Sequence, residues 1–364
     1  LTLIFIFNRF QEVNKLSISQ NDLSLSTHYS YLIDAKYEVS STNVLSKIHN
    51  FTRAKLNKAQ IDFGQQHNWH SIELINNFNT FRDIVILLDN PMLNEINVFI
   101  KTGDELILYS KLGDTRLSNT LEQIAIPHIT HKLAPLNKTT LYIETTTTGV
   151  STLPIAIFDA KDFNRYKGSI YLLWGVFVGV VILMCVYNLI LYMGSSNSIY
   201  LLYIGYISTF LLELGLVHGY LIYILPSWLF AFFSENIMTL NLVIGFFAIS
   251  FCYSFLKYNE EPKLILSKIS RWYAVFNLLF ALISLIVIEY KMAPIYFIIQ
   301  LFLYILAIAL LVRKIRKKEK WARFYFISWF PLFVGAVVGP LLFTGNIEYN
   351  FWTRHALLLG VLFE

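Results

Sequence analysis

Cysteine is scarce in this sequence. Among its 364 residues there are only two cysteines, Cys185 and Cys252, and both lie within apolar stretches. The more polar residues 20–165 contain none. This pattern excludes a small domain held together by disulfides, and it predicts that both cysteines serve as small buried residues.

Charged residues are also few. They make up 15% of the chain, whereas about 25% is usual in soluble proteins. Hydrophobic residues make up 55% and aromatic residues 16%, and the mean hydropathy is +0.53. This composition predicts a membrane protein.

The sequence also lacks motifs of catalysis. It has no phosphate-binding glycine loop, no GxSxG and no HExxH, so nothing in it supports an enzyme, and we expect no cofactor. The net charge is +5, but many basic residues lie in two short loops between apolar stretches. That distribution predicts membrane topology and argues against nucleic acid as a partner.

Residues 169–193 form the most informative stretch. It has no formal charge, and Asn188 is its only strongly polar side chain. Crossing a hydrocarbon core of roughly 30 Å takes about 20 apolar residues in a helix, so this stretch predicts a transmembrane helix. The chain is polar before residue 169 and mostly hydrophobic after it, which makes this position the main domain boundary.

Further transmembrane helices are predicted downstream. The segment at the end of the chain has too few residues to cross a membrane, so the sequence predicts a seven-helix domain over 169–364 with an incomplete seventh helix. In the sixth helix, Gly335 and Gly339 form a GxxxG, which predicts close helix packing. The helices after the first are expected at about 199–223, 232–256, 272–289, 294–312, 321–343 and 351–364.

Lysine and arginine predict the orientation. The loop at 257–271 carries four basic residues and the loop at 313–323 carries seven, whereas the opposite loops carry very few. The positive-inside rule places the two basic loops in the cytosol. The N-terminal domain then lies outside the membrane and the C-terminus inside the cell. Residues 1–19 are interpreted as a signal-peptide remnant and lead-in.

Residues 20–165 predict a compact all-β domain. Short runs of Val, Ile, Thr, Tyr and Phe alternate between apolar and polar positions, separated by turn signals such as Asp89-Asn90-Pro91. This is typical of an antiparallel sandwich with its own core. A short linker from Asp159 to Gly168 is expected to couple the domain rigidly to the first helix. The expected strands lie at 68–75, 81–88, 95–101, 106–110, 140–146 and 153–158.

The β domain contains candidate ligand-binding residues. Trp69, Tyr142 and Phe158 lie on different expected strands and could stack on a sugar, although strand aromatics more often fill a sandwich core. The pairs His67/His70 and His128/His131 have a spacing seen in metal sites. Residues three apart on a strand point to opposite faces, so we expect no metal site.

The helical region contains candidate functional residues of another kind, namely polar side chains inside the membrane. Glu213 lies midway along the second expected helix, where a charge is costly unless it is paired or protonated. At 100° per residue, Tyr206, Thr209, Glu213 and Tyr220 share one helix face and predict a polar seam. Three further intramembrane residues, which more often join helices than bind ligands, are Asn188, Asn241 and Gln300.

Several segments together resemble a known family. In the β domain these are NWHSIELINN, IVILLDNPMLNEINVFI and LYIETTTTGVSTLPIAIFDAKDF. In the helical region they are YNLILYMGSSNSIYLLYIGYISTF and ARFYFISWFPLFVGAVVGPLLFTG. Over residues 20–364 the chain resembles bacterial seven-transmembrane receptors with diverse intracellular signalling modules, and its N-terminal part resembles the second type of extracellular sensing domain in that family.

The resemblance implies a jelly-roll domain of carbohydrate-binding type in the periplasm, followed by seven helices in the inner membrane. It also implies a cytosolic output module, commonly a diguanylate cyclase or a histidine kinase, in the same chain or in a partner. The expected partners are therefore the lipid bilayer, a small molecule such as a carbohydrate, a signalling module and, as an open question, a second copy of the chain.

Three alternatives remain at the level of sequence. The first is a transporter or channel component with an appended β domain, although no repeat or broken helix is evident. The second is a retinal photoreceptor, which needs a lysine in its last helix, and residues 351–364 contain none. The third is an anchor that only displays a binding domain, for which seven spans are more than is needed.

Overall fold

The structure is a computed structural model that divides into two compact units. The β-domain unit comprises residues 1–172, 217–227 and 338–355, and the helical unit comprises residues 173–216, 228–337 and 356–364. The expected signal-peptide remnant at 1–19 lies outside the described residues. The structure describes residues 25–34, 36–55, 67–114, 121–147, 152–286, 289–343 and 346–364.

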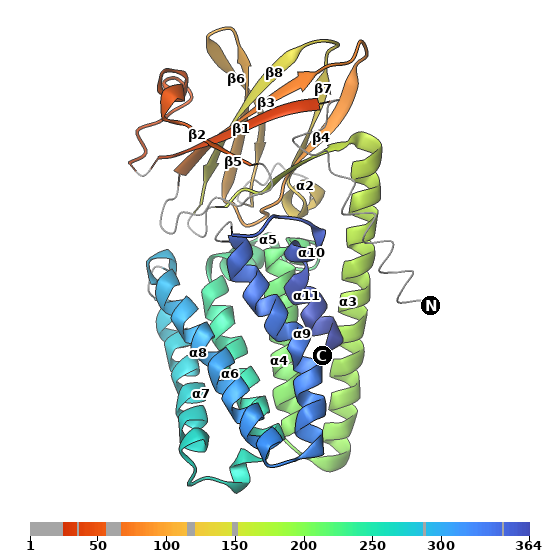
Figure 1. The fold of residues 1–364 in the computed structure, drawn as a ribbon, viewed down its shortest axis with the longest axis vertical. Coiled ribbons are helices and arrows are strands. Elements are labelled where there is room, and N and C mark those ends of the chain that lie inside the picture. The colour runs from red at the N-terminus through yellow and green to blue at the C-terminus, as the bar shows by residue number, and fades with distance from the viewer. Residues whose placement is uncertain are drawn as a thin grey trace. The chain divides into compact units, whose positions relative to one another are not determined.

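Two antiparallel sheets form the β domain (Figure 1). The larger sheet has the strand order β2-β1-β3-β8-β5-β6, and the smaller has the order β7-β4-β9. Within the described residues the strands are β1 (Leu25–Ile33), β2 (Thr52–Ala54), β3 (His67–Asn76), β4 (Arg82–Leu88), β5 (Glu95–Thr102), β6 (Glu105–Leu112), β7 (His128–Leu133), β8 (Lys138–Thr146) and β9 (Ile155–Asp159).

Alternation along the strands gives the large sheet two different faces. On β3, Ile72 and Leu74 point inward and pack with Ile84 and Ile86 of the small sheet in the main core. Trp69 points to the opposite face, where Phe99, Tyr142, Val39 and Val44 form a second cluster. The segment that carries Val39 and the 3-10 helix η1 (Val44–Asn50) therefore covers part of the outer face.

The predicted sandwich is confirmed. Each of the six expected strands overlaps an observed one. Strand β1, LSTHYSYLI, was not predicted, because its Ser, Thr and His residues dilute the apolar alternation. It is nevertheless fully paired with β3 from Leu25↔Asn76 to Ile33↔Asn68, so its place is fixed by tertiary pairing rather than by its own pattern.

The first membrane helix, α3 (Ala160–Ser195), begins directly after β9. We expected a linker at 159–168 and a helix start at residue 169, and the structure corrects this, because the linker is helical. Along the first part of α3, buried residues recur every three or four positions, which is the spacing of one helix face. They are Phe163, Tyr166, Ile170 and Leu173. This amphipathic pattern lies in a stretch too charged to register as membrane-spanning.

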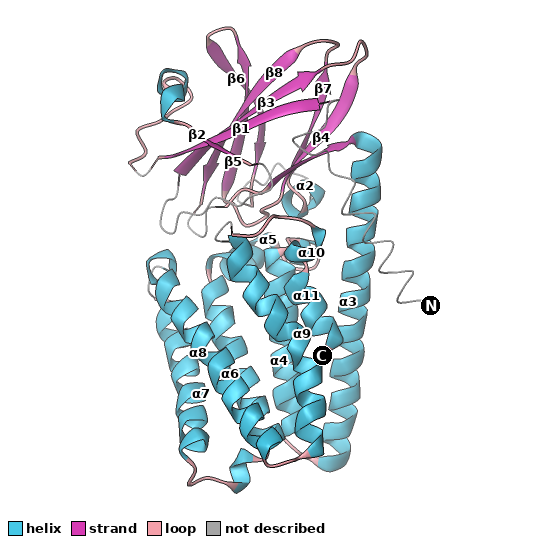
Figure 2. Cartoon of the chain, in the orientation of Figure 1, coloured by secondary structure: helices cyan, strands magenta, loops and turns pink. Residues whose placement is uncertain are grey.

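Six helices are long and apolar enough to cross a membrane within the described residues. They are α3, α4 (Ile199–Val217), α6 (Ile237–Phe255), α7 (Ile265–Ser284), α8 (Glu289–Arg316) and α9 (Lys320–Phe343). In the helical unit, α6 packs against both α7 and α8 (Figure 2). Shorter helices are α2 (Leu121–Ala125), η2 (Tyr220–Tyr223), α5 (Ser227–Glu235), η3 (Tyr258–Glu260), α10 (Phe351–Arg354) and α11 (Ala356–Phe363).

The segment expected as an incomplete seventh helix consists of two pieces. Asn350 begins α10 with a capping box, and a turn at His355 separates α10 from α11. Within the helical unit, a Cβ added to Gly335 would lie 2.8 Å from the Ala356 carbonyl oxygen, and one added to Gly360 would lie 2.8 Å from the Leu332 Cα. Helices α9 and α11 therefore cross in close contact, as the glycine at 335 predicts. A Cβ on Gly339 would meet nothing within 4 Å.

Candidate sensing and coupling sites

The β domain contains a buried network of two carboxylates and one imidazole. His67, on β3, places Nδ1 2.9 Å from Asp34 Oδ2 and Nε2 2.9 Å from Glu144 Oε1. Asn97 donates from Nδ2 to Glu144 Oε2 at 3.0 Å. Both ring nitrogens can donate to ionised carboxylates only when the imidazole is protonated, so two ionised carboxylates here require an imidazolium between them.

The electrostatics of the network support this assignment. Burial opposes charge on the His67 ring, yet the hydrogen bonds to Glu144 and Asp34 outweigh it and raise the His67 pKa. Burial likewise opposes ionisation of the two carboxyls. Backbone N–H groups of Val39 and Glu38 together with His67 hold the pKa of Asp34 below its usual value, and His67 with Asn97 does the same for Glu144.

Tyr37 lies over this network. Its ring stacks on the His67 ring, with centroids 5.0 Å apart and planes 8° from parallel. Its backbone has φ of 55°, a left-handed conformation that costs a non-glycine residue about 1 kcal/mol. Because 53% of the residue remains exposed, Tyr37 presents an aromatic surface to solvent beside Glu144. This combination of an aromatic ring and polar groups is suited to a small polar ligand.

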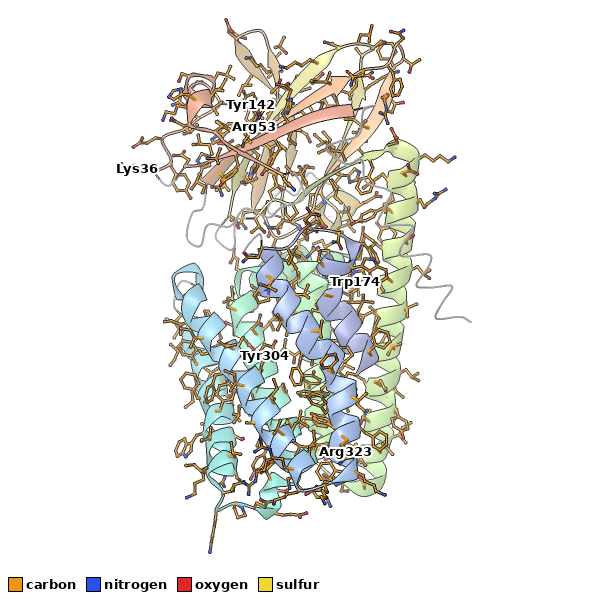
Figure 3. The ribbon with its side chains drawn as sticks, viewed as in Figure 1. Lys36, Arg53, Tyr142, Trp174, Tyr304 and Arg323 are labelled. Atoms are coloured by element: carbon orange, nitrogen blue, oxygen red, sulfur yellow. The ribbon has the colours of Figure 1, made fainter. Side chains whose placement is uncertain are left out.

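The three aromatic residues proposed from the sequence do not form one exposed platform. Trp69 and Tyr142 lie on the outer face of the large sheet, in the cluster covered by the Val39 segment, and Trp69 donates from Nε1 to the Val39 carbonyl at 3.3 Å. Tyr142 is labelled in Figure 3. Phe158 lies on the small sheet and packs against Phe163 and Tyr166. All three are buried, so ligand contact by them stays a prediction.

The two histidines of each pair, His67/His70 and His128/His131, contact different groups. His70 faces the core side of β3, where the Tyr29 hydroxyl lies 2.9 Å from its Nδ1, and burial lowers its pKa to about 3. His128 donates to the Ile126 carbonyl, and His131 packs against Tyr109. In the described part of the chain, no three His, Cys, Asp or Glu side chains converge as a metal site requires.

A second set of contacts within the β-domain unit joins the sheet to segments that flank the membrane helices. The Arg354 guanidinium lies 3.4 Å from both carboxylate oxygens of Asp89, which follows β4, and it donates from Nη2 to the Val217 carbonyl at 2.9 Å. The Tyr349 hydroxyl also donates to Asp89. We call Asp89, Val217, Tyr349 and Arg354 the Arg354 junction.

The junction is physically well placed. Val217 is the last residue of α4, and the final carbonyls of a helix have no partner within the helix and carry partial negative charge. The Arg354 guanidinium therefore balances the charge of Asp89 and also donates a hydrogen bond to the last carbonyl of α4. The side chains of Arg354 and Asp89 are 9% and 15% exposed, so water screens this ion pair only weakly.

Two histidines and a glycine extend the junction. The rings of His218 and His355 stack with centroids 4.9 Å apart. Gly219 has φ of 78°, and a Cβ there would lie 2.6 Å from the Ala125 carbonyl oxygen and 2.7 Å from Pro91. Only glycine fits this contact between η2, α2 and the turn after β4.

Sequence reasoning missed the junction. The sequence indicates only a turn at Asp89, and Arg354 is one of the few basic residues outside the two basic loops. The two residues lie 265 positions apart, and neither belongs to a motif that would connect them. A turn carboxylate and a lone arginine within the expected helix 351–364 were visible signals, but their pairing required the fold.

The helical unit contains a polar chain in its interior. Asn241, on α6, donates from Nδ2 to Glu213 Oε1 on α4 at 2.6 Å. Gln300, on α8, donates from Nε2 to the Asn241 backbone carbonyl at 2.8 Å. Tyr206, about two turns before Glu213 on the same face of α4, donates to Glu364 Oε2 at 2.8 Å. The first two bonds join α4, α6 and α8 through Asn241, and Glu213 is 8% exposed.

The structure brings together only some of the expected seam. Tyr206, Glu213 and Gln300 line one cavity in the helical unit, with Asn241 added. Thr209 bonds to the Gly205 carbonyl of its own helix, and Asn188 to the Met184 carbonyl of its own. Tyr220 is not on the α4 face, because α4 ends at Val217. It belongs to the β-domain unit and packs against Tyr171.

The fold and these sites define a multi-pass membrane protein with an N-terminal β-sandwich domain. Residues 170–364 match the family model described as 7TM diverse intracellular signalling, and residues 26–159 match the one described as 7TMR-DISM extracellular 2. The chain belongs to the 7TM diverse intracellular signalling family, a family of membrane receptors with an extracellular sensing domain. This confirms the resemblance seen in the sequence. The chain has no match among curated proteins.

Proposed function

We propose that this protein is a signalling receptor of a bacterial inner membrane. Its β domain faces the periplasm and binds a small molecule, for which carbohydrate is the class that the resemblance indicates. Its helices pass the response to a cytosolic module, which belongs to the same chain or to a partner. The Arg354 junction carries this proposal, because one guanidinium contacts both a β-domain carboxylate and the last carbonyl of a membrane helix.

The junction suggests how a response would travel. A ligand that shifts the turn after β4 changes the distance from Asp89 to Arg354, and with it the balance between two arrangements of the helix ends. The Asn241–Glu213 bond, which joins α6 to α4, is a contact that such a rearrangement would strain. A ligand can shift the balance only by its difference in affinity for the two states.

Hydrogen exchange of the full chain in lipid nanodiscs tests the proposal against a panel of soluble mono- and oligosaccharides. A binding sugar should slow exchange in the β strands and change exchange in the basic segments 257–264 and 317–319. Arg354→Gln should keep the first effect and lose the second. Arg165→Gln, which removes an exposed arginine from α3, is the matched control and should keep both.

Two results would count against this reading. If a sugar protects the β domain of the unmodified protein and the basic segments do not respond, the β domain binds without signalling through the helices. If no sugar in the panel alters the β strands, carbohydrate is the wrong class of ligand.

A further inference from the structure

The helical unit contains a partly open cavity of about 40 Å³. A water molecule needs roughly 10–15 Å³ of such space, so the cavity has room for a few water-sized species, far less than an organic ligand requires. Its polar lining comes from α4, α6 and α8, and Tyr304 on α8 is labelled in Figure 3. The polar residues of the lining include Tyr206, Glu213, Asn241, Gln300 and Tyr304.

Hydrogen-bond accounting shows that this lining offers four oxygen acceptors, together with the Tyr304 hydroxyl, which can donate. Asn241 uses its amide N–H groups on Glu213 Oε1 and on the Ile237 carbonyl, which leaves its side-chain oxygen. Gln300 donates to the Asn241 backbone, which leaves its own side-chain oxygen. Tyr206 gives its proton to Glu364, so its oxygen can only accept from other groups. Glu213 contributes a second carboxylate oxygen.

The charge of the lining is also unbalanced. Glu213 is the acidic residue of the lining, and among the described residues no lysine, arginine or histidine forms an ion pair with it. An ionised carboxylate inside a membrane domain is costly without a compensating positive charge. Both the excess of oxygen acceptors and the missing charge would be satisfied by the same occupant.

From this lining we infer that the cavity is a binding site for one small monovalent cation, with Glu213 as its counter-charge. Sodium fits the chemistry, because hard cations take oxygen ligands and the cavity offers them from a carboxylate, two amides and a hydroxyl. One carboxylate balances one positive charge. A calcium ion needs 6–8 oxygen ligands and a second negative charge, for which this cavity is too small and too weakly acidic.

A bound cation would join three helices through one ion. The oxygens come from Tyr206 and Glu213 on α4, Asn241 on α6 and Gln300 on α8, so occupancy favours the arrangement that holds these helices together. The inference is independent of the ligand of the β domain, and it stands or fails separately from the proposed signalling role.

Thermal unfolding of the full chain in nanodiscs provides the test. Sodium chloride is compared with N-methyl-D-glucamine chloride at the same ionic strength, because the organic cation is too large for the cavity. The Tm should rise with sodium, and at a hundredfold excess over Kd the folded state should gain about a hundredfold in the unfolding equilibrium. Glu213→Gln should abolish this dependence.

Two further variants make the result specific. Gln300→Leu removes one oxygen and keeps the carboxylate, so it should weaken sodium binding about tenfold or more, and it serves as the test if Glu213→Gln does not fold. Glu235→Gln neutralises an exposed carboxylate at the end of α5 and should leave the sodium dependence unchanged.

Equal Tm values in the two salts would overturn the inference, as would an unaltered sodium response in Glu213→Gln or in Gln300→Leu. A Tm that responds to pH through Glu213 but not to sodium would show a protonated carboxyl in place of a cation site, and would also overturn it.

Discussion

A single imidazole ring, that of His67, joins the loop after β1 to strand β8. It does so through the buried carboxylate of Asp34 and the partly buried carboxylate of Glu144. Buried charges are stable as a set and costly when one partner is removed, because the others are left without compensation. The contribution of this network to folding should therefore depend on His67 more than on either carboxylate.

His67→Gln should destabilise the β domain by about 3 kcal/mol. The pH dependence should change as well. Because the pKa of His67 is raised in the folded protein, the stability that His67 contributes is fully present below its ordinary pKa of about 6.5. That stability is lost as pH rises through the higher pKa of the folded state. The pKa values of Asp34 and Glu144 are lowered in the folded protein. The stability that these two carboxylates contribute is therefore lost as pH falls through their pKa values in the folded state.

Pulse proteolysis of the full chain from about pH 5 to about pH 9, read from β-domain peptides, measures this profile. His67→Gln should flatten the alkaline decline, and His49→Gln, which alters an exposed histidine, should leave it in place. A variant whose alkaline decline matches that of the unmodified protein would show that His67 does not carry it.

Gly219 offers a second test at the residue scale, with a matched control in the same chain. Gly219→Ala combines a left-handed backbone with overlap against Ala125 and Pro91, which together should cost about 3 kcal/mol. Gly103→Ala has φ of 62° but meets nothing within 4 Å, so it should cost only about 1 kcal/mol. Apparent Tm values of the two variants in detergent provide the comparison, and equal losses would show that packing at Gly219 contributes nothing.

At the scale of elements, α3 is the continuous connection between the small sheet and the membrane region. It begins directly after β9, and its first turns are fixed by Phe163 and Tyr166 against Phe158 and by an ion pair of 2.6 Å between Lys167 and Glu122 of α2. A helix transmits translation and rotation along its axis far better than a flexible linker does.

Inserting a flexible Gly/Ser spacer after Asp162 should therefore uncouple the two parts of the protein. In the exchange experiment with a binding saccharide, the β strands should still be protected, while the response of segment 257–264 should disappear. The same spacer placed in the exposed turn between Gly103 and Asp104 should leave that response intact. A response that survives the Asp162 insertion would rule out α3 as the coupling element.

At the scale of the whole molecule, orientation is the property that lysine and arginine predict. The segment after α6 holds Glu261 in ion pairs with Lys314 and Lys317 at 3.0 and 2.8 Å, so the two basic loops meet on one side of the helical unit. This is consistent with a shared cytosolic side for both loops.

Cysteine labelling measures the orientation directly. In a background in which Cys185 and Cys252 are replaced by serine, a membrane-impermeant maleimide added to spheroplasts should label Asp104→Cys in the β domain. Lys263→Cys, in the first basic loop, should react only after lysis. The reverse pattern would place the β domain in the cytosol and refute the proposed periplasmic sensing.

The sequence predicted what depends on local pattern and missed what depends on distant pairing. Uninterrupted apolar runs located the membrane helices, and alternation located most strands. Helix ends were harder to predict: α4 ends at Val217, and at Gly219 the backbone has φ of 78° and passes too close to Ala125 and Pro91 for a side chain. Tyr220 was misplaced for this reason. Glu213 was identified by its rarity inside a membrane span, but its partner Asn241 and the cavity between them required the fold.

The composition of the β-domain unit has a consequence for how such receptors can exchange parts. Segments 217–227 and 338–355 belong to the same compact unit as the sandwich, although they lie far downstream in the chain. A chimera made with one crossover near residue 160 would transplant Asp89 and Pro91 while leaving Arg354 and Gly219 behind. Functional recombination between relatives should therefore need three grafted segments, and natural shuffling of the sensor should leave matched substitutions at both remote loops.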